Sequence, residues 1–339
     1  MTNSQTAVGG PRPLEIAVVI ATYRRPDLLA RCLAALRVQT IAGSRYEVIV
    51  ADDDAGNDGA ARTKDLVGVH NDSTGGAPHF RYVPVTRTQG PAGARNAGWR
   101  TSAARLIAFT DDDTIPEPGW LAAGIESLAD RYDAVGGAIR MPLPVRPTDY
   151  ERNESGLTRA EFATSNCFVH RTGLEAVDGF DERFTAAWRE DSDLHFALLE
   201  AGYHVGHAPD AVVVHPVRPA PFGVSISQQR KVVFDALLFR KHRRLYRTRI
   251  LASPPWLYYL IAGALVAAVV GLVAQRPTLA LAALALWLAA TLRFALMRLS
   301  GTSRRMSHVA EMLWTSIVIP PLALWWRAVG NVRYRVLFL

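Results

Sequence analysis

Three consecutive carboxylates, Asp111, Asp112 and Asp113, follow an apolar run in the segment LIAFTDDDTIPEPGW at residues 106–120. Like charges this close raise one another's pKa unless a cation or a network of donors holds them. A solvated turn would also explain the triplet, because Asp is common where a chain leaves regular structure. A divalent cation typically takes one or two carboxylates and completes its shell with substrate phosphates and water. The triplet is therefore a candidate site for a cation and a phosphate-bearing substrate.

A second acidic pair, Glu190 and Asp191, begins a predicted helix further along the chain. The distance in sequence between the triplet and this pair suits two different tasks. The triplet would hold metal and diphosphate, and the pair would accept a proton from an attacking hydroxyl. His215 follows the last predicted strand and is a candidate third metal ligand, with a structural histidine as the alternative. Trp188 is a candidate for the wall of an acceptor pocket, and ordinary packing explains it equally well.

The elements that must position these residues alternate along the chain. Apolar runs at 14–22, 46–51, 79–85 and 106–110 predict strands, and a helical period covers 25–39. Further strands are expected at 133–141 and 211–215, with an irregular loop at 142–163. This alternation predicts an α/β fold with a mostly parallel sheet covered on both faces.

Ligands of such sheets bind beyond the carboxyl ends of the strands. The segment ATYRRP and the acidic runs at 52–54 and 111–113 each follow a predicted strand. The prediction therefore brings three strand ends to one rim. A chance scatter of turn carboxylates would not require that arrangement, so the functional interpretation of the acidic triplet is favoured.

The charge distribution separates the chain into parts. Residues 1–227 carry a net charge of −7, while 228–250 and 251–339 each carry +7. We expect a flexible N-terminus at 1–13, a catalytic domain at 14–227, a basic amphipathic juxtamembrane helix at 228–250 and a membrane region at 251–339. A nucleic-acid binder would carry its basic residues on the folded domain. Here they flank an apolar tail, which indicates membrane lipids as partners and no nucleic acid.

Two apolar runs, 254–274 and 278–297, are long enough to cross a bilayer. A third, 309–326, contains Glu311, Pro320 and Pro321 and is the weakest candidate, so two or three spans are expected. The basic cluster within 240–249 places residues 1–250 in the cytoplasm by the positive-inside rule. A third full crossing would put the basic residues after 326 outside, so a re-entrant or interfacial segment competes with it. No signal peptide is expected.

Residues 14–227 resemble the inverting glycosyltransferases of family 2, which have the GT-A fold, a Rossmann-like α/β architecture. The resemblance rests on five segments in the family's order: VVIATYRRPDLLARCLAAL, EVIVADD, GPAGARNAG, FTDDDTIPEPGWL and REDSDLHFALLEAGYHV. It implies a membrane-anchored glycosyltransferase that moves a sugar from a nucleotide-diphosphate sugar to a hydroxyl acceptor. The acceptor is expected to be lipid-linked or a glycan, at the cytoplasmic face of the cell membrane.

The resemblance also implies roles for individual residues. Asp113 would bind the cation, Mn²⁺ or Mg²⁺, with Asp111 as a partner and His215 as a further candidate. Asp191 would be the general base, and Glu190 would position the acceptor or the base. The nucleotide-sugar would be contacted by residues after three strands and on one helix: Thr22, Tyr23, Arg24, Asp53, Arg95, Asp111 and Asp112. For the base contact, Asp52 is a one-residue alternative to Asp53, because the loop DDDAGNDG is one residue longer than the usual family form.

Two other functions are compatible with parts of the sequence. AFTDDDTI resembles the nucleophile motif of haloacid-dehalogenase-like phosphatases, with Asp111 as nucleophile, but these enzymes use a downstream Lys and residues 114–190 contain none. A non-catalytic membrane scaffold could retain the fold without turnover. A Walker-type triphosphatase is excluded, because the Gly-rich stretch lacks the Gly-Lys-Ser/Thr ending.

Overall fold

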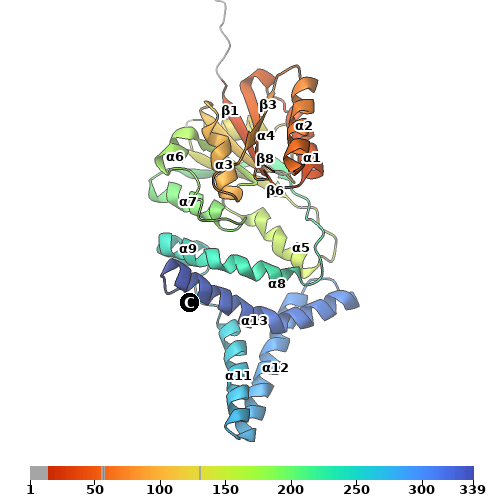
Figure 1. The fold of residues 1–339 in the computed structure, drawn as a ribbon, viewed down its shortest axis with the longest axis vertical. Coiled ribbons are helices and arrows are strands. Elements are labelled where there is room, and N and C mark those ends of the chain that lie inside the picture. Colours follow the sequence, from red (N-terminus) through yellow and green to blue (C-terminus); the bar gives the residue numbers. More distant parts are fainter. Residues whose placement is uncertain (1–13, 55, 57, 130) are drawn as a thin grey trace, which may run out of the picture. The chain divides into compact units, whose positions relative to one another are not determined.

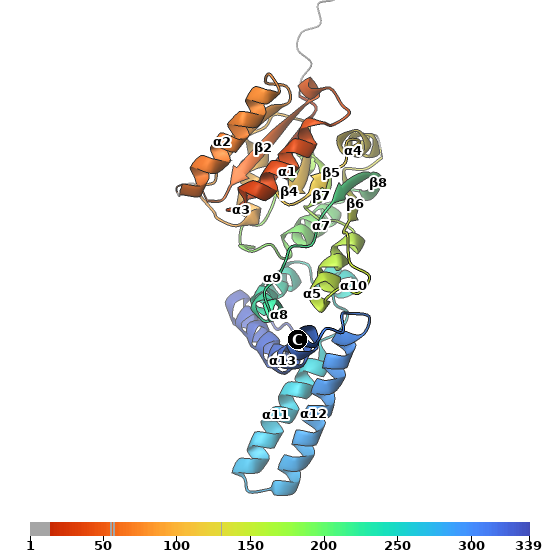
Figure 2. The same cartoon turned by 90° about the vertical axis from the view of Figure 1, so that its right-hand side faces the viewer.

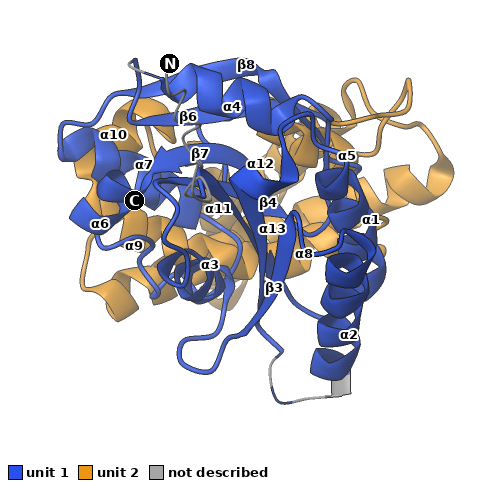
Figure 3. Cartoon of the chain, turned by 90° about the horizontal axis from the view of Figure 1, so that it is seen from above, with its two compact units in different colours: residues 1–140, 160–216 blue, residues 141–159, 217–339 orange. Residues whose placement is uncertain are grey.

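The computed structural model describes residues 14–339 apart from 55, 57 and 130, so the N-terminal segment expected to be flexible lies outside the described residues. The chain forms two compact units (Figure 3). The first holds the chain up to residue 140 and residues 160–216, and the second holds 141–159 and 217–339. The segment 141–159, within the expected catalytic domain, thus belongs to the unit that carries the long apolar helices.

The first unit is built on an eight-stranded sheet with the order β3-β2-β1-β4-β7-β6-β8-β5. Its strands are β1 Ile16–Thr22, β2 Tyr46–Asp52, β3 His79–Pro84, β4 Leu106–Asp111, β5 Ile115–Pro116, β6 Ala134–Arg140, β7 Asn166–His170 and β8 Val205–Val214. The strands β3, β2, β1 and β4 pair in parallel, and β7 is antiparallel to both β4 and β6. Since β8 is parallel to β6, the strands β1, β2, β4, β6 and β8 all run in one direction. The predicted α/β fold with a mostly parallel sheet is confirmed.

Helices cover both faces of this sheet (Figure 1). They are α1 Pro26–Arg37, α2 Asp58–Ser73, α3 Pro91–Arg100, α4 Trp120–Leu128, α6 Arg171–Ala176 and α7 Glu190–Glu200, with a 3₁₀ turn η1 at Gly43–Arg45. Trp99 of α3 and Leu194 of α7 belong to one buried cluster with Val19, Ile49 and Phe109 of the sheet. On α1, Pro26 occupies the first turn, where its missing N–H costs nothing, and the buried residues recur with the helical period.

The second unit is helical. It contains α5 Asp149–Glu154, η2 Ser155–Arg159, α8 Val224–Gln228, η3 Gln229–Val232, α9 Val233–Lys241, α10 Arg243–Arg249, α11 Trp256–Val273, α12 Pro277–Leu299 and α13 Met306–Tyr334 (Figure 2). The segment expected as one juxtamembrane helix therefore holds η3, α9 and α10. Residues 233–239 of α9 are all buried, so this stretch is part of the packed unit and its apolar side chains are not at the surface.

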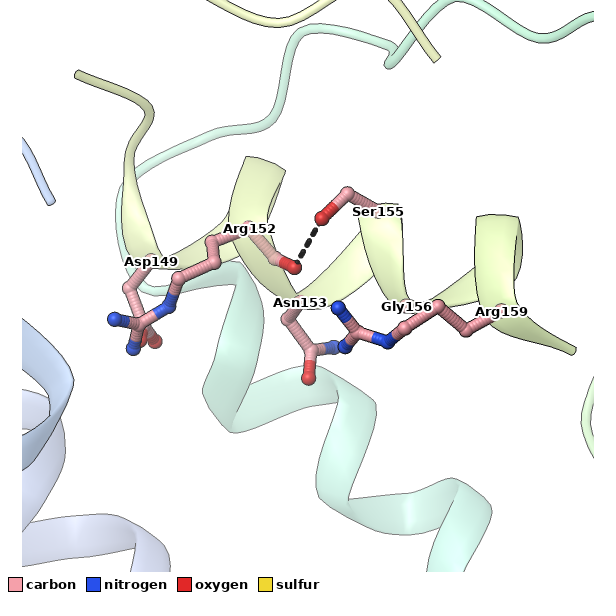
Figure 4. Close-up of a pocket in the computed structure, with 6 residues that line it drawn as sticks. All are labelled: Asp149, Arg152, Asn153, Ser155, Gly156 and Arg159. Atoms are coloured by element: carbon pink, nitrogen blue, oxygen red, sulfur yellow. Dashed lines mark hydrogen bonds and ion pairs between the residues drawn. The ribbon is translucent and has the colours of Figure 1, made fainter. Parts of the chain in front are cut away.

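The helices α11, α12 and α13 are each long and apolar enough to cross a membrane. A polar pocket of about 390 Å³ lies in the same unit at α5 and η2 (Figure 4). It is lined by Asp149, Arg152, Asn153, Ser155, Gly156 and Arg159. None of the site residues expected from the sequence lines this pocket; all of them belong to the first unit.

Candidate active site

The carboxyl ends of the co-directional strands bring the expected site residues to one edge of the sheet. Thr22 ends β1, Asp52 ends β2, Asp111 ends β4, and His215 follows β8. Backbone hydrogen bonds tie these ends together, because Asp53 N donates to Thr22 O at 2.9 Å and His215 N donates to Arg140 O at 2.8 Å. Segments far apart in the sequence thus meet where ligands of parallel sheets bind.

The middle residue of the acidic triplet, Asp112, points into the protein and is 3% exposed. Thr22 Oγ1 donates to its Oδ2 at 2.8 Å, and Arg25 Nη1 donates to its Oδ1 at 3.3 Å. Burial raises the pKa of Asp112 to about 6, against the opposing effect of Arg25. Both carboxylate oxygens are engaged by protein donors, so a direct contact between Asp112 and a nucleotide would require one of these bonds to open.

The two outer residues of the triplet face His215. One ligand atom from each of Asp111, Asp113 and His215 lies within 4.8 Å of the others. His215 Nε2 is 3.5 Å from Asp113 Oδ1, and the buried His215 Nδ1 has no hydrogen-bond partner among the described residues. Carboxylate oxygens with an imidazole nitrogen suit Mn²⁺ and similar divalent ions. The residues present therefore fit a divalent cation.

Arg95 of α3 joins the two acidic groups. It is 3% exposed, and its Nη2 lies 2.8 Å from Asp111 Oδ1 while its Nη1 lies 3.0 Å from Glu190 Oε1. A guanidinium has the planar fork that such bridging needs. The residue expected beside the nucleotide thus holds the end of β4 against the start of α7.

The start of α7 presents the second acidic pair. Arg189, with φ of 76°, precedes Glu190, which is buried, and Asp191, which is partly exposed. Burial raises the pKa of Glu190 to about 7, with Arg95 opposing that rise and Asp191 adding to it. Burial also raises the pKa of Asp191, although the Ser192 N–H donates to Asp191 Oδ1 at 2.6 Å and counteracts the effect. Asp191 therefore offers a fixed carboxylate whose proton affinity lies above that of an ordinary Asp.

The neighbouring residues Asp52 and Asp53, at the end of β2, differ in their burial and hydrogen bonds. Asp52 is fully buried and accepts hydrogen bonds from Tyr82 Oη at 3.2 Å and Asp54 N at 3.0 Å. Asp53 accepts a bond from Gly90 N at 2.8 Å on Oδ2, while its buried Oδ1 has no protein partner among the described residues. Burial raises the pKa of Asp53, against the effect of the Gly90 bond. The geometry favours Asp53 over Asp52 as the residue with a free acceptor atom.

The remaining expected residues, Tyr23, Arg24 and Trp188, are exposed or partly exposed. Tyr23 is 47% exposed, and the Arg24 guanidinium stacks over its ring at 5.1 Å while pairing with Asp54 at 3.0 Å. The Trp188 ring is covered by the Arg189 guanidinium at 4.6 Å.

One residue of the site had no role in the sequence interpretation. Arg25 reaches Asp112 and also lies 3.8 Å from Asp113. Its position in ATYRRP, one residue before the helix proline, was the available signal.

Comparison with known families gives two matches. The family described as "Glycosyl transferase family 2" matches residues 17–176, and the one described as "Glycosyl transferase family group 2" matches residues 106–326. The second match covers more than half of the chain and includes both acidic motifs, α11, α12 and the greater part of α13.

Several glycosyltransferases have sequences similar to this chain. The glycosyltransferase AglE of Haloferax volcanii is 27% identical over 254 residues, which cover 71% of this chain and 79% of AglE. A pre-mycofactocin glycosyltransferase of Mycobacterium tuberculosis is 30% identical over 234 residues, which cover 62% of this chain and 44% of that protein. The matched part is thus less than half of the mycobacterial relative.

Among solved structures, a mannosyltransferase from Pyrobaculum calidifontis, in complex with GDP-Man and Mn²⁺, has a similar fold. Its TM-score is 0.58 at 21% sequence identity, over 94% of this chain and 87% of that one. At this identity the likeness shows a common GT-A fold.

Proposed function

Because this chain belongs to glycosyltransferase family 2 and is a glycosyltransferase, we propose that it transfers a sugar from a nucleotide-diphosphate sugar to a hydroxyl acceptor with inversion and with a divalent cation. The observation that carries this proposal is the meeting of the acidic groups at one edge of the sheet. Arg95 contacts Asp111 on one side and Glu190 on the other. One of the cation ligands, Asp111, and the residue next to the base, Glu190, are thus held by a single buried side chain.

In this proposal, Asp111, Asp113 and His215 hold the cation. Their ligand atoms lie within 4.8 Å of one another, which is the support for this assignment. When bound, the cation stabilises the negative charge that develops on the diphosphate leaving group. The Mn²⁺ and GDP-Man of the Pyrobaculum calidifontis mannosyltransferase accord with this arrangement.

Asp191 acts as the general base. The acceptor oxygen forms a bond to the anomeric carbon as the bond from that carbon to the diphosphate oxygen breaks, and the hydroxyl proton passes to the Asp191 carboxylate. The Ser192 N–H and hydroxyl, both within hydrogen-bond distance of Oδ1, hold the carboxylate in place. Glu190 orients the start of the helix through its ion pair with Arg95.

The nucleotide lies along the ends of β1 and β2. The free Oδ1 of Asp53 is a buried acceptor, which suits an N–H of a base. The exposed ring of Tyr23, with Arg24 beside it, offers a surface for stacking. Uridine, guanosine and thymidine all satisfy these contacts.

We further propose that the acceptor is lipid-linked and that the first unit lies on the cytoplasmic side of the cell membrane. The support is the pair of charge-free or nearly charge-free helices α11 and α12 and the basic residues that flank them. A purified enzyme that preferred water-soluble acceptors over every lipid-linked one in membranes would contradict the acceptor assignment.

A phosphatase with Asp111 as nucleophile is set aside, because the family is one of glycosyltransferases and Asp111 is ion-paired with Arg95. A scaffold without turnover is separated from an enzyme by assay. We expect detergent-solubilised protein to show higher thermal stability with one class of nucleotide-sugar and Mn²⁺ together than with either alone, because ligands that bind the folded state raise its stability. We also expect slow, metal-dependent hydrolysis of that donor. Absence of both effects with UDP-, GDP- and dTDP-sugars would refute the proposal.

A further inference from the structure

The helix α13 has the composition of a membrane span, but its contacts indicate a different position. It runs for 29 residues with Pro320 and Pro321 inside. At roughly 1.5 Å per residue it is about 43 Å long, more than the roughly 30 Å of a hydrocarbon core. If it crossed the bilayer, its first and last turns would lie in different compartments.

The first turns of α13 are bonded to segments that precede α11. Asp149 N donates to His308 Nε2 at 3.4 Å, and Gly223 N donates to Glu311 Oε1 at 2.7 Å. Because Asp149 and Gly223 come before the first span, they lie on one side of the membrane. The start of α13 lies on that side too.

The last turns of α13 contact the same side. Arg240 Nη1 donates to Tyr334 O at 2.9 Å. A Cβ added at Gly330 would lie 2.9 Å from the Ala236 Cβ and 3.0 Å from Val233 O, so the backbone of α13 lies directly against α9. Arg240, Ala236 and Val233 also precede α11. Both ends of α13 therefore lie on the same side of the membrane as the residues up to 250.

The third turn of α13 meets the exit of the α11–α12 hairpin. Arg298, in the last turn of α12, lies 2.6 Å by its Nη1 from Thr315 Oγ1 and 2.8 Å by its Nη2 from Asp149 Oδ2. The third turn of α13 thus lies at the base of the hairpin, and the start and the end of α13 contact segments that precede the hairpin. Figures 1 and 2 show α13 running across that base, transverse to α11 and α12.

The outward side of α13 is a continuous apolar stripe. Apart from the neighbours Leu313 and Trp314, its members recur every three or four residues, and none of them carries a charge: Leu313, Trp314, Ile317, Pro321, Trp325, Ala328 and Val332. Trp314 is 54% exposed and Trp325 63% exposed. Apolar side chains on α11 and α12, such as Leu272 and Leu281, are exposed as well. Tryptophan on an in-plane helix is typical of the boundary between headgroups and acyl chains.

We propose that α13 does not cross the membrane but lies along its surface, with the stripe in the lipid and the C-terminus on the same side as the catalytic unit. The chain then has two spans, α11 and α12. This inference rests on the membrane attachment proposed above. It also keeps Arg327, Arg333 and Arg335 on the side of Arg298 and Arg304, as the positive-inside rule requires.

Single-cysteine labelling of the full chain in sealed vesicles of known orientation tests the topology. Cys32 and Cys167 are both fully buried, so the unaltered chain serves as the blank for an impermeant maleimide. Val145→Cys reports the side that precedes α11, Thr278→Cys reports the hairpin turn, and Leu337→Cys reports the end of the chain. We expect Leu337→Cys and Val145→Cys to react in the same vesicle orientation and Thr278→Cys in the opposite one.

The two-span topology would be overturned if Leu337→Cys reacted in the same vesicle orientation as Thr278→Cys. It would also be overturned if Leu337→Cys reacted in neither orientation until detergent was added. Equal reaction of all three variants in sealed vesicles would instead remove the membrane attachment. Neither readout depends on transfer activity, so an inactive preparation does not affect the test.

Fluorescence quenching tests the position of the stripe. A polarity-sensitive dye is attached at Ile317→Cys on α13 and, as the matched control, at Leu288→Cys, 59% exposed in the middle of α12. We expect a lipid-borne quencher near the headgroup to quench the dye at Ile317→Cys at least twofold more than a quencher near the chain end, with the reverse order at Leu288→Cys. Deeper quenching at both positions would place α13 across the bilayer and refute the proposal.

Discussion

Removing the guanidinium that joins the two acidic groups is the most informative perturbation of the site. Arg95→Met keeps the length of the side chain but removes the positively charged guanidinium that pairs with both Asp111 and Glu190. The side chain of Glu190 is 5% exposed and that of Asp111 is 27% exposed. Most of the free-energy cost of losing the guanidinium therefore falls on Glu190, because water partly screens the charge of Asp111. Breaking a buried ion pair typically costs about 3–5 kcal/mol, and the partial exposure of Asp111 places this case near the lower end.

The assay is thermal unfolding of the detergent-solubilised full chain. For a unit of roughly 200 residues, each kcal/mol shifts Tm by about 2–4 °C, so Arg95→Met should lower Tm by about 6–12 °C. The matched control is Arg100→Met on the same helix. Arg100 is 43% exposed and pairs with the 96% exposed Asp178, so its loss should lower Tm by no more than about 3 °C.

A second substitution and a change of pH isolate the electrostatic cause. Glu190→Gln added to Arg95→Met removes the uncompensated buried charge and should restore at least half of the lost Tm. The pKa of Glu190, about 7 in the folded protein, lies above its ordinary value of 4.5. Between about pH 4.5 and 7, native Glu190 therefore binds more protons than the unfolded chain does, and its contribution to stability falls as pH rises through this window. The Arg95→Met deficit should be smaller at pH 6 than at pH 8. Equal deficits for Arg95→Met and Arg100→Met, or no recovery in the double variant, would refute this reasoning.

Three further outcomes are expected. Asp113→Asn and His215→Gln should each abolish the manganese-dependent part of the thermal shift. The unfolding temperature without ligand should change by less than about 3 °C in each variant. If one variant kept the full manganese response, the residue changed in it would not be a ligand of the cation. Asp53→Ala should weaken nucleotide binding at least about fivefold in calorimetric titration without changing the order of preference for metals, because a lost hydrogen bond to a buried group costs about 1–3 kcal/mol. Gly90→Ala should destabilise the protein by at least about 1 kcal/mol, because the φ of Gly90 is 105° and the added Cβ would lie 2.8 Å from Thr185 O. Gly119→Ala should be nearly neutral, because no atom lies within 4 Å of its added Cβ. Equal losses of stability in the two variants would contradict the backbone strain expected at residue 90.

The sequence predicts the sheet edge well, because strand ends in parallel sheets share one rim. The strands before Thr22, Asp52 and Asp111 were predicted from their apolar runs, and the structure brings those ends together. The strand β7 was not predicted, because the five residues Asn166–His170 have no long apolar run and lie in a segment without a clear period. Its antiparallel place in the middle of the sheet depends on pairing with β4 and β6, which local sequence does not encode.

Side-chain partners were less accessible to sequence reasoning. The motif pattern identified Arg95 and Asp112 but not their orientation, because contacts such as Arg95 with Glu190 join residues far apart in the chain. The basic segment at 228–250 was expected to present an amphipathic surface. The apolar residues of α9 are instead buried and the helix packs against α13, a choice of partner that composition alone does not determine.

The central claim is that a carboxylate at the start of α7 deprotonates an acceptor beside a cation-held donor. The most direct measurement compares donor binding and single-turnover transfer in Asp191→Asn and the unaltered enzyme, using the nucleotide-sugar and metal that give the largest thermal shift. We expect Asp191→Asn to bind the donor with an affinity within about threefold of that of the unaltered enzyme and to lose transfer by at least about 100-fold, the range typical of general-base catalysis. Normal transfer by Asp191→Asn would contradict the central claim.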